Sequence, residues 1–66
     1  MARRIAIRIY ERITALIRAP HAGRKGRLED TRELVISGLP FQVIYRVRAD
    51  VIEVDRILHG AQQWPV

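Results

Sequence analysis

The chain lacks cysteine entirely over its 66 residues. It therefore has no disulfide, no thiolate ligand for a structural zinc ion and no thiol nucleophile. Its two histidines, His21 and His59, lie far apart without metal-ligand spacing, so we expect no metal and no cofactor. The absence of cysteine fits a cytoplasmic protein, in which thiol–disulfide chemistry is rare.

Long apolar runs are also absent from the sequence. No stretch approaches the roughly 18 consecutive apolar residues of a transmembrane helix, and no signal peptide with an apolar core is visible. We therefore expect no membrane partner and one small domain over residues 1–66. A domain of this size buries only about 60% of the surface of its unfolded chain. Its stability should be marginal unless a partner covers apolar surface.

The charge is unevenly distributed along the chain. Residues 1–27 contain eight basic side chains and one glutamate, whereas residues 28–66 contain four basic and six acidic side chains. A basic N-terminal half could meet nucleic acid, an anionic surface or an acidic protein. The alternative is that these arginines only keep one helix face soluble.

A helix is predicted over residues 2–19. Its apolar residues recur at helical spacing and form one stripe: Ile5, Ile9, Ile13, Leu16 and Ile17. Pro20 ends the helix, because the residue before a proline is disfavoured in the α region. A polar loop containing Gly23 and Gly26 follows over residues 20–30.

Three strands are predicted in the second half, over residues 31–36, 41–48 and 51–59, followed by a tail over residues 60–66. A four-residue loop, Ser37–Pro40, would join the first two strands, and a tight turn at Ala49-Asp50 would join the last two. The fold class is therefore α+β, with one helix packed on a three-stranded antiparallel β-meander.

The alternation of apolar residues predicts how the last two strands pair. With a turn at Ala49-Asp50, the numbers of two opposed residues add up to an odd sum. An odd-numbered residue of one strand then faces an even-numbered residue of the other, and this places the apolar residues of both strands on one face. The predicted pairs are Val47/Ile52, Arg46/Glu53, Tyr45/Val54 and Val43/Arg56. The Arg46/Glu53 pair would then form a cross-strand ion pair contributing about 0.2–1 kcal/mol.

This register places two arginines on the apolar face. Arg56 would lie opposite Val43, and Arg32 would lie near Tyr45. A buried guanidinium needs a partner or a path to water. Either both arginines reach solvent or pair with Glu11 or Glu29, or they line a cationic pocket.

Several motifs from residue 20 onward resemble the RelE/ParE toxins of bacterial type II toxin–antitoxin pairs. They are P-x-x-G-R (Pro20–Arg24), T-R-E-L-V-I (Thr31–Ile36), L-P-F-x-V-I-Y-R-V (Leu39–Val47) and R-I-L-H-G-A-x-x-W-P (Arg56–Pro65). The resemblance implies a helical hairpin, a β-meander and a variable tail. The first strand and first helix of a typical member have no counterpart. An uncovered helix flank and an open sheet edge favour association, so we expect a homodimer or an antitoxin-bound oligomer.

The resemblance also indicates which positions would carry catalysis. RelE-type ribosome-dependent ribonucleases place basic residues on the outer sheet face and in the tail, where positive charge stabilises the scissile phosphate. The corresponding positions here are Glu33, Val35, Gln42 and Gln62, and none of these is cationic. His59, expected beside Gln42, is the one titratable candidate for an acid or base, unless it is a hydrogen-bonded structural residue. The sequence therefore favours a protein that is not an enzyme.

The Y-R-V and L-H-G-A-x-x-W-P motifs resemble the ParE branch more closely. Such toxins of plasmid-stabilisation modules inhibit DNA gyrase by binding it and are neutralised by an antitoxin. The resemblance implies contact residues on the sheet, the tail and the helix stripe: Arg32, Arg46, Arg56, His59, Gln62, Trp64, Ile5, Ile9 and Ile13. Trp64 would contact the target unless it folds back on the sheet. Alternatives are an mRNA interferase acting at the ribosome, a truncated toxin that only binds antitoxin, and a membrane-active basic helix.

Overall fold

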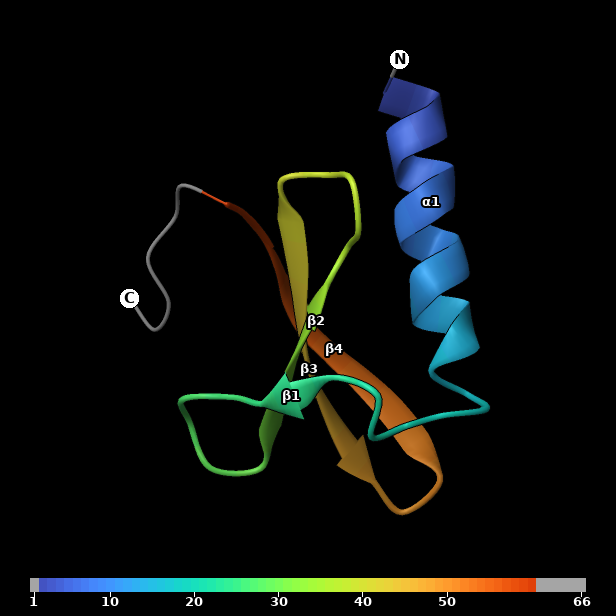
Figure 1. Cartoon of the computed structure of the whole chain (residues 1–66). Helices are drawn as coiled ribbons and strands as arrows, with labels where there is room; N and C mark the ends of the chain where they lie inside the picture. Colours follow the sequence, from blue (N-terminus) through green and yellow to red (C-terminus); the bar gives the residue numbers. More distant parts are fainter. Residues whose placement is uncertain (1, 61–66) are drawn as a thin grey trace.

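The computed structural model describes residues 2–60. Helix α1 (Ala2–Ala15) is followed by strands β1 (Arg24–Lys25), β2 (Thr31–Val35), β3 (Phe41–Arg48) and β4 (Val51–His59). The strands form one antiparallel sheet in the order β1-β2-β3-β4. Helix α1 lies along one face of this sheet (Figure 1), which we call the inner face; the opposite face is the outer face. The predicted α+β class is confirmed.

Helix α1 ends at Ala15, four residues before the predicted boundary. The next turn is tighter, with i→i+3 backbone hydrogen bonds from Leu16 to Ile13 (3.0 Å) and from Ile17 to Thr14 (3.1 Å). In this turn Leu16 is buried against the sheet, at 1% exposure, whereas Ile17 is 71% exposed. The apolar stripe therefore includes Leu16 but not Ile17, which the sequence had assigned to it.

Strand β1 lies within the segment that was predicted as a loop. Arg24 and Lys25 pair with Glu33 and Arg32 of β2. Gly26 donates its backbone N–H to Thr31, at 2.8 Å, and closes the connection to β2. A pair of polar residues has no measurable alternation, so sequence periodicity could not reveal this strand.

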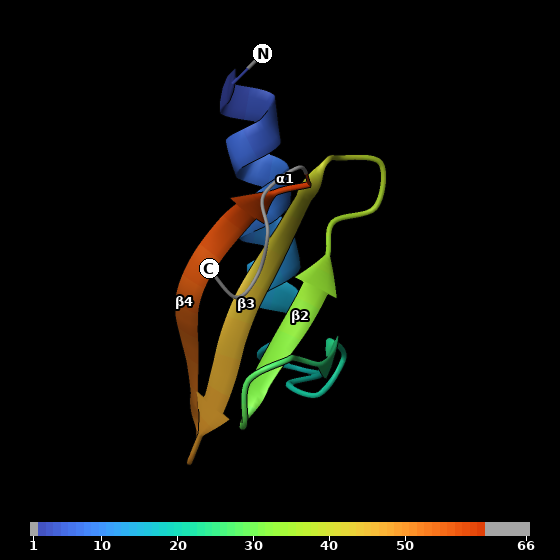
Figure 2. The same ribbon diagram turned by 90° about the vertical axis from the view of Figure 1, so that its left-hand side faces the viewer.

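The hydrophobic core lies between α1 and the inner face. Its buried side chains come from the end of the helix and the central strands: Leu16, Leu34, Ile36, Val43 and Tyr45. Ile9 and Ile13 of α1 pack against this cluster. Fully burying one such aliphatic side chain contributes about 1.5–3 kcal/mol, so the attachment of α1 depends on a few side chains. Figure 2 shows α1 behind the three long strands.

Both predicted hairpin connections are present. Ile36 donates its backbone N–H to Phe41 across the Ser37–Pro40 loop, at 3.0 Å, and Gly38 in this loop has φ +78°, which glycine adopts without steric cost. Arg48 faces Val51, which leaves Ala49 and Asp50 as the turn between β3 and β4.

The predicted register between β3 and β4 is correct next to the turn and wrong beyond it. Val47, Arg46 and Tyr45 face Ile52, Glu53 and Val54 as predicted. A β-bulge then adds Asp55 to β4, so Arg56 faces Ile44 and not Val43. One extra residue reverses every later side chain relative to simple alternation. Arg56 therefore lies on the outer face, and the expectation of an arginine at this position of the apolar face was wrong.

Candidate functional site

The outer face of the sheet carries paired charges. Arg46 Nη1 lies 2.6 Å from Asp55 Oδ2, and both side chains are about one-fifth exposed. The predicted ion pair between Arg46 and Glu53 is absent, because the bulge brings Asp55 to Arg46. Glu53 lies instead 3.9 Å from Arg48. The carboxylate beside Arg46 is therefore that of the bulge residue Asp55 and not that of Glu53, the residue directly opposite.

Glu33 is the buried carboxylate of the outer face, with 7% of its side chain exposed. Its Oε1 accepts a hydrogen bond from Arg24 Nε at 3.1 Å. Its Oε2 is buried and has no hydrogen-bond partner among residues 2–60. Strand β1 therefore has an electrostatic role, because it brings Arg24 to a carboxylate that would otherwise be buried without a counter-charge.

The outer face presents neutral side chains around these ion pairs. Val35 of β2 lies opposite Gln42 of β3 and is 53% exposed. Ile44 and Leu58 are buried together at the centre of this face. Arg24, Arg46 and Arg48 each lie beside a carboxylate. A scissile phosphate needs cations that are not neutralised by neighbouring acids, and these three arginines do not meet that requirement.

His59 lies at the end of β4 on the inner face. It faces Phe41, and the two rings meet edge to face with centroids 5.4 Å apart. Gln42 faces Leu58, so the predicted position of His59 beside Gln42 was wrong, again because of the bulge. His59 thus lies against the Phe41 ring, on the face opposite to Gln42, Glu33 and Val35.

Arg32 lies on the inner face opposite Tyr45, as predicted. Its guanidinium donates to the backbone carbonyl of Gly23 at 2.8 Å and to that of His21 at 3.4 Å. These loop carbonyls satisfy the arginine in place of the expected partners Glu11 and Glu29. Arg32 is therefore part of the packing between the loop and the sheet.

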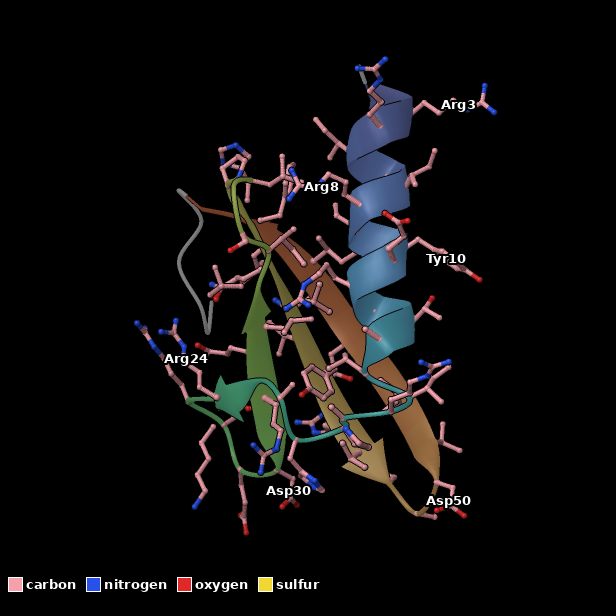
Figure 3. The ribbon with its side chains drawn as sticks, turned by 45° about the vertical axis from the view of Figure 1, so that its right-hand side comes forward. Arg3, Arg8, Tyr10, Arg24, Asp30 and Asp50 are labelled. Atoms are coloured by element: carbon pink, nitrogen blue, oxygen red, sulfur yellow. The ribbon has the colours of Figure 1, made fainter. Side chains whose placement is uncertain are left out.

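An apolar hollow lies between the C-terminal half of α1 and the β3–β4 hairpin. It has a volume of about 720 Å³ and is lined mainly by apolar side chains: Tyr10, Ile13, Thr14, Ile17, Pro20, Val47, Ala49, Asp50, Val51 and Ile52. We call it the helix–hairpin groove. Tyr10, 71% exposed, stands out from α1 at its rim (Figure 3). The sequence signal for this groove is the spacing of seven residues between Tyr10 and Ile17, which places both on one side of a helix.

The remaining predicted contact residues separate into two groups. Ile5, Ile9 and Ile13 are half-buried along α1, and Ile9 and Ile13 contact the core, so only part of the stripe is accessible. Gln62 and Trp64 lie outside the described residues. Arg8 of α1 donates a hydrogen bond to the backbone carbonyl of Ser37 at 2.6 Å.

Within residues 2–60 neither a candidate metal site nor a membrane-crossing helix is found. No cluster of three or more histidine and carboxylate side chains could hold a metal ion. None of the helical structure in this part of the chain is long and apolar enough to cross a membrane.

Comparison with known proteins identifies the family. The family model described as "ParE toxin of type II toxin-antitoxin system, parDE" matches residues 1–64. A curated protein of Sinorhizobium fredii (strain NBRC 101917 / NGR234), named "Putative toxin Y4kP", is 42% identical over 64 residues. The match covers 97% of this chain and 66% of that relative, so the chain spans slightly less than two thirds of its length. No solved structure matches. The family model matches almost the whole chain, and the helix and sheet are of the expected class. The chain therefore belongs to the ParE toxin family of type II toxin–antitoxin systems.

Proposed function

We propose that this ParE-family protein is a toxin that acts by binding, that its target is DNA gyrase, and that a cognate antitoxin neutralises it. The observation that supports binding over RNA cleavage is the charge state of the outer face. Arg24, Arg46 and Arg48 lie beside Glu33, Asp55 and Glu53. Such paired cations stabilise a developing phosphate charge poorly, because the neighbouring carboxylates repel the phosphate.

The position of His59 supports the same choice. A catalytic acid or base must reach the atom whose proton it transfers, at about 2.6–3.2 Å or through one water. His59 lies on the inner face against Phe41, whereas the positions aligned with RelE-type catalytic residues, Glu33, Val35 and Gln42, lie on the outer face. A substrate on the outer face would therefore not meet the imidazole.

The helix–hairpin groove supports the proposed antitoxin contact. A type II antitoxin would present an apolar segment, and the groove offers Ile17, 71% exposed, and Val51, 61% exposed, on its two walls. The exposed basic side chains of α1, such as Arg4 and Arg12, lie along the same helix. They would attract acidic residues of that segment, with the modest contribution of surface ion pairs.

The test compares the two activities with the same purified protein. Added to DNA gyrase, plasmid and ATP, it should reduce supercoiling and trap cleaved plasmid, while mRNA in a cell-free translation system stays intact. Trp64→Ala should weaken the effect on gyrase, because the tail is the proposed target contact. Cleavage of ribosome-bound mRNA that is lost in His59→Ala would overturn the proposal in favour of the interferase.

A growth assay tests toxicity itself. Expression in a host without the antitoxin should slow growth, and co-expression of the antitoxin should restore it. Ile17→Asp places a charge in the groove and should prevent this rescue without reducing toxicity. Normal growth on expression of the soluble wild-type protein, together with formation of an antitoxin complex, would instead indicate a protein that only competes for antitoxin.

A further inference from the structure

The two cross-strand pairs between β1 and β2 differ in charge. On the outer face Arg24 lies opposite Glu33, and the two side chains form an ion pair. On the inner face Lys25 lies opposite Arg32. Directly opposed like charges destabilise a sheet, and among residues 2–60 neither Lys25 nor Arg32 has a carboxylate partner. A strand of only two residues therefore holds two cations against each other.

These two cations line a hollow beside the connection from β1 to β2. Its volume is about 450 Å³, and Arg27, Glu29 and Asp30 line it as well. Both carboxylate residues are exposed, so water and salt screen their charge. Arg32 is half-buried. The least exposed charge of the hollow is therefore a guanidinium.

Arg32 is held in a fixed orientation by the loop after α1. Its Nη1 donates to the backbone carbonyls of Gly23 and His21. A guanidinium has five N–H donors, and the three on Nε and Nη2 make no hydrogen bond to residues 2–60. Two N–H groups on one planar edge match two oxygens of an anion. Besides packing the loop on the sheet, Arg32 therefore offers an unused fork to an anion.

The connection between β1 and β2 is closed by its own hydrogen bonds. Gly26 donates its backbone N–H to Thr31 at 2.8 Å, and the Thr31 hydroxyl donates to the backbone carbonyl of Leu28 at 2.6 Å. A Cβ on Gly26 would clash with the Thr31 hydroxyl, so the close approach requires glycine. An anion would bind to a site that is already formed, which lowers the entropic cost of binding.

We propose that this hollow binds a phosphate monoester between Lys25 and Arg32. The Arg32 fork would donate to two phosphate oxygens, and the Lys25 ammonium group would donate to the third. The anion would replace the repulsion between the two cations by two attractions. A phosphate monoester suits the pair better than a carboxylate, because it carries up to two charges and three free oxygens. Free nucleotides and the 5′-phosphate ends of nucleic acids both supply such a group. The site does not depend on the proposed action on gyrase.

Stability in the presence of phosphate is the first test. Inorganic phosphate should raise the thermal midpoint of the wild-type protein above that in chloride of equal ionic strength, because a ligand of the folded chain stabilises it. Lys25→Gln should lose this rise. In chloride its midpoint should be no lower than that of the wild type, since the repulsion with Arg32 is removed.

The matched control is Arg12→Gln, which removes the same charge from an exposed position of α1. Its midpoint should respond to phosphate as the wild type does. Phosphate also stabilises folded proteins in general, because it is excluded from their surface. An equal rise in all three proteins would therefore overturn the proposal, and so would the absence of a rise in the wild type.

Titration calorimetry measures the affinity and identifies the source of the phosphate. Both dAMP and a 5′-phosphorylated oligonucleotide should bind the wild type, and Lys25→Gln should weaken this binding about tenfold, the equivalent of one charge-assisted hydrogen bond. Tighter binding of dAMP indicates a nucleotide as the ligand, and tighter binding of the oligonucleotide indicates a nucleic-acid end. Equal affinity for the oligonucleotide with and without its 5′-phosphate would overturn the monoester site.

The carboxylates of the hollow test the sign of the effect. Glu29→Gln/Asp30→Asn removes two negative charges and should tighten dAMP binding, because these carboxylates repel the phosphate. Asp30 has φ +64°, and asparagine tolerates this left-handed conformation as aspartate does. Weaker dAMP binding by the folded double variant would contradict a phosphate in this hollow.

Discussion

At the scale of single residues, Tyr45 links the loop after the helix to the sheet. Its side chain is fully buried, with 0% exposure. Its hydroxyl donates to the backbone carbonyl of Pro20 at 2.7 Å and accepts from the backbone N–H of Gly23 at 2.9 Å. A Cβ on Gly23 would lie 2.8 Å from the tyrosine ring, so this close approach requires glycine.

Tyr45→Phe should lower the free energy of unfolding by about 1–3 kcal/mol, because it leaves a buried donor and acceptor without partners. Urea denaturation followed by circular dichroism measures this loss. Tyr10→Phe is the matched control, since Tyr10 is 71% exposed, and its stability should match the wild type. Equal stability of both variants would mean that the Tyr45 hydroxyl does not hold the loop.

At the scale of elements, the turn between β3 and β4 contains a strained residue. Ala49 has φ +52°, in the left-handed region that costs a non-glycine residue roughly 1–2 kcal/mol. The hairpin forms nevertheless, because this turn allows β3 and β4 to pair along their length. This strain is one place where the stability of the sheet can be increased without touching a side-chain contact.

Ala49→Gly should therefore raise the free energy of unfolding by about 0.5–1 kcal/mol. Glycine removes the strain at positive φ, but part of this gain is lost because glycine gives the unfolded chain more conformational entropy. Thermal denaturation should show a midpoint several degrees higher. Ala6→Gly, at an exposed position of α1, makes the same chemical change in a helix and should lower stability by about 1 kcal/mol. A lower midpoint for Ala49→Gly would contradict the strain.

The strands also show how far alternation predicts a sheet. The residues from Tyr45 to Val47 were placed correctly against Ile52–Val54, because the turn and the apolar pattern both determine that part. Beyond Asp55 the assignments of Arg56 and His59 failed together. A bulge leaves no mark in alternation, since it is stabilised by contacts such as Arg46–Asp55 that depend on the folded sheet.

At the scale of the whole molecule, the chain combines a small core with apolar surface at β4 and at the helix–hairpin groove. Val51, Val54, Ile57, Ile17 and Tyr10 are between 39% and 71% exposed. Burying such surface on association would stabilise the folded chain. The homodimer expected from the sequence would therefore couple folding to association.

The thermal midpoint should rise with protein concentration, because dissociation accompanies unfolding of a dimer. Scanning calorimetry from a few to several hundred micromolar measures this shift. A wild-type midpoint that does not move with concentration would show that folding and association are separate.

The sequence by itself determined the fold class, the hairpin turns, the pairing next to the β3–β4 turn and the family, because apolar periodicity, turn residues and motif order are local properties. It also indicated that the aligned catalytic positions, Glu33, Val35 and Gln42, carry no cations. Only the tertiary structure decided the end of α1, the short strand β1, the bulge at Asp55 and hence the faces of Arg56 and His59. Each of these depends on contacts between residues distant in the chain, and alternation or helical spacing contains no information about them.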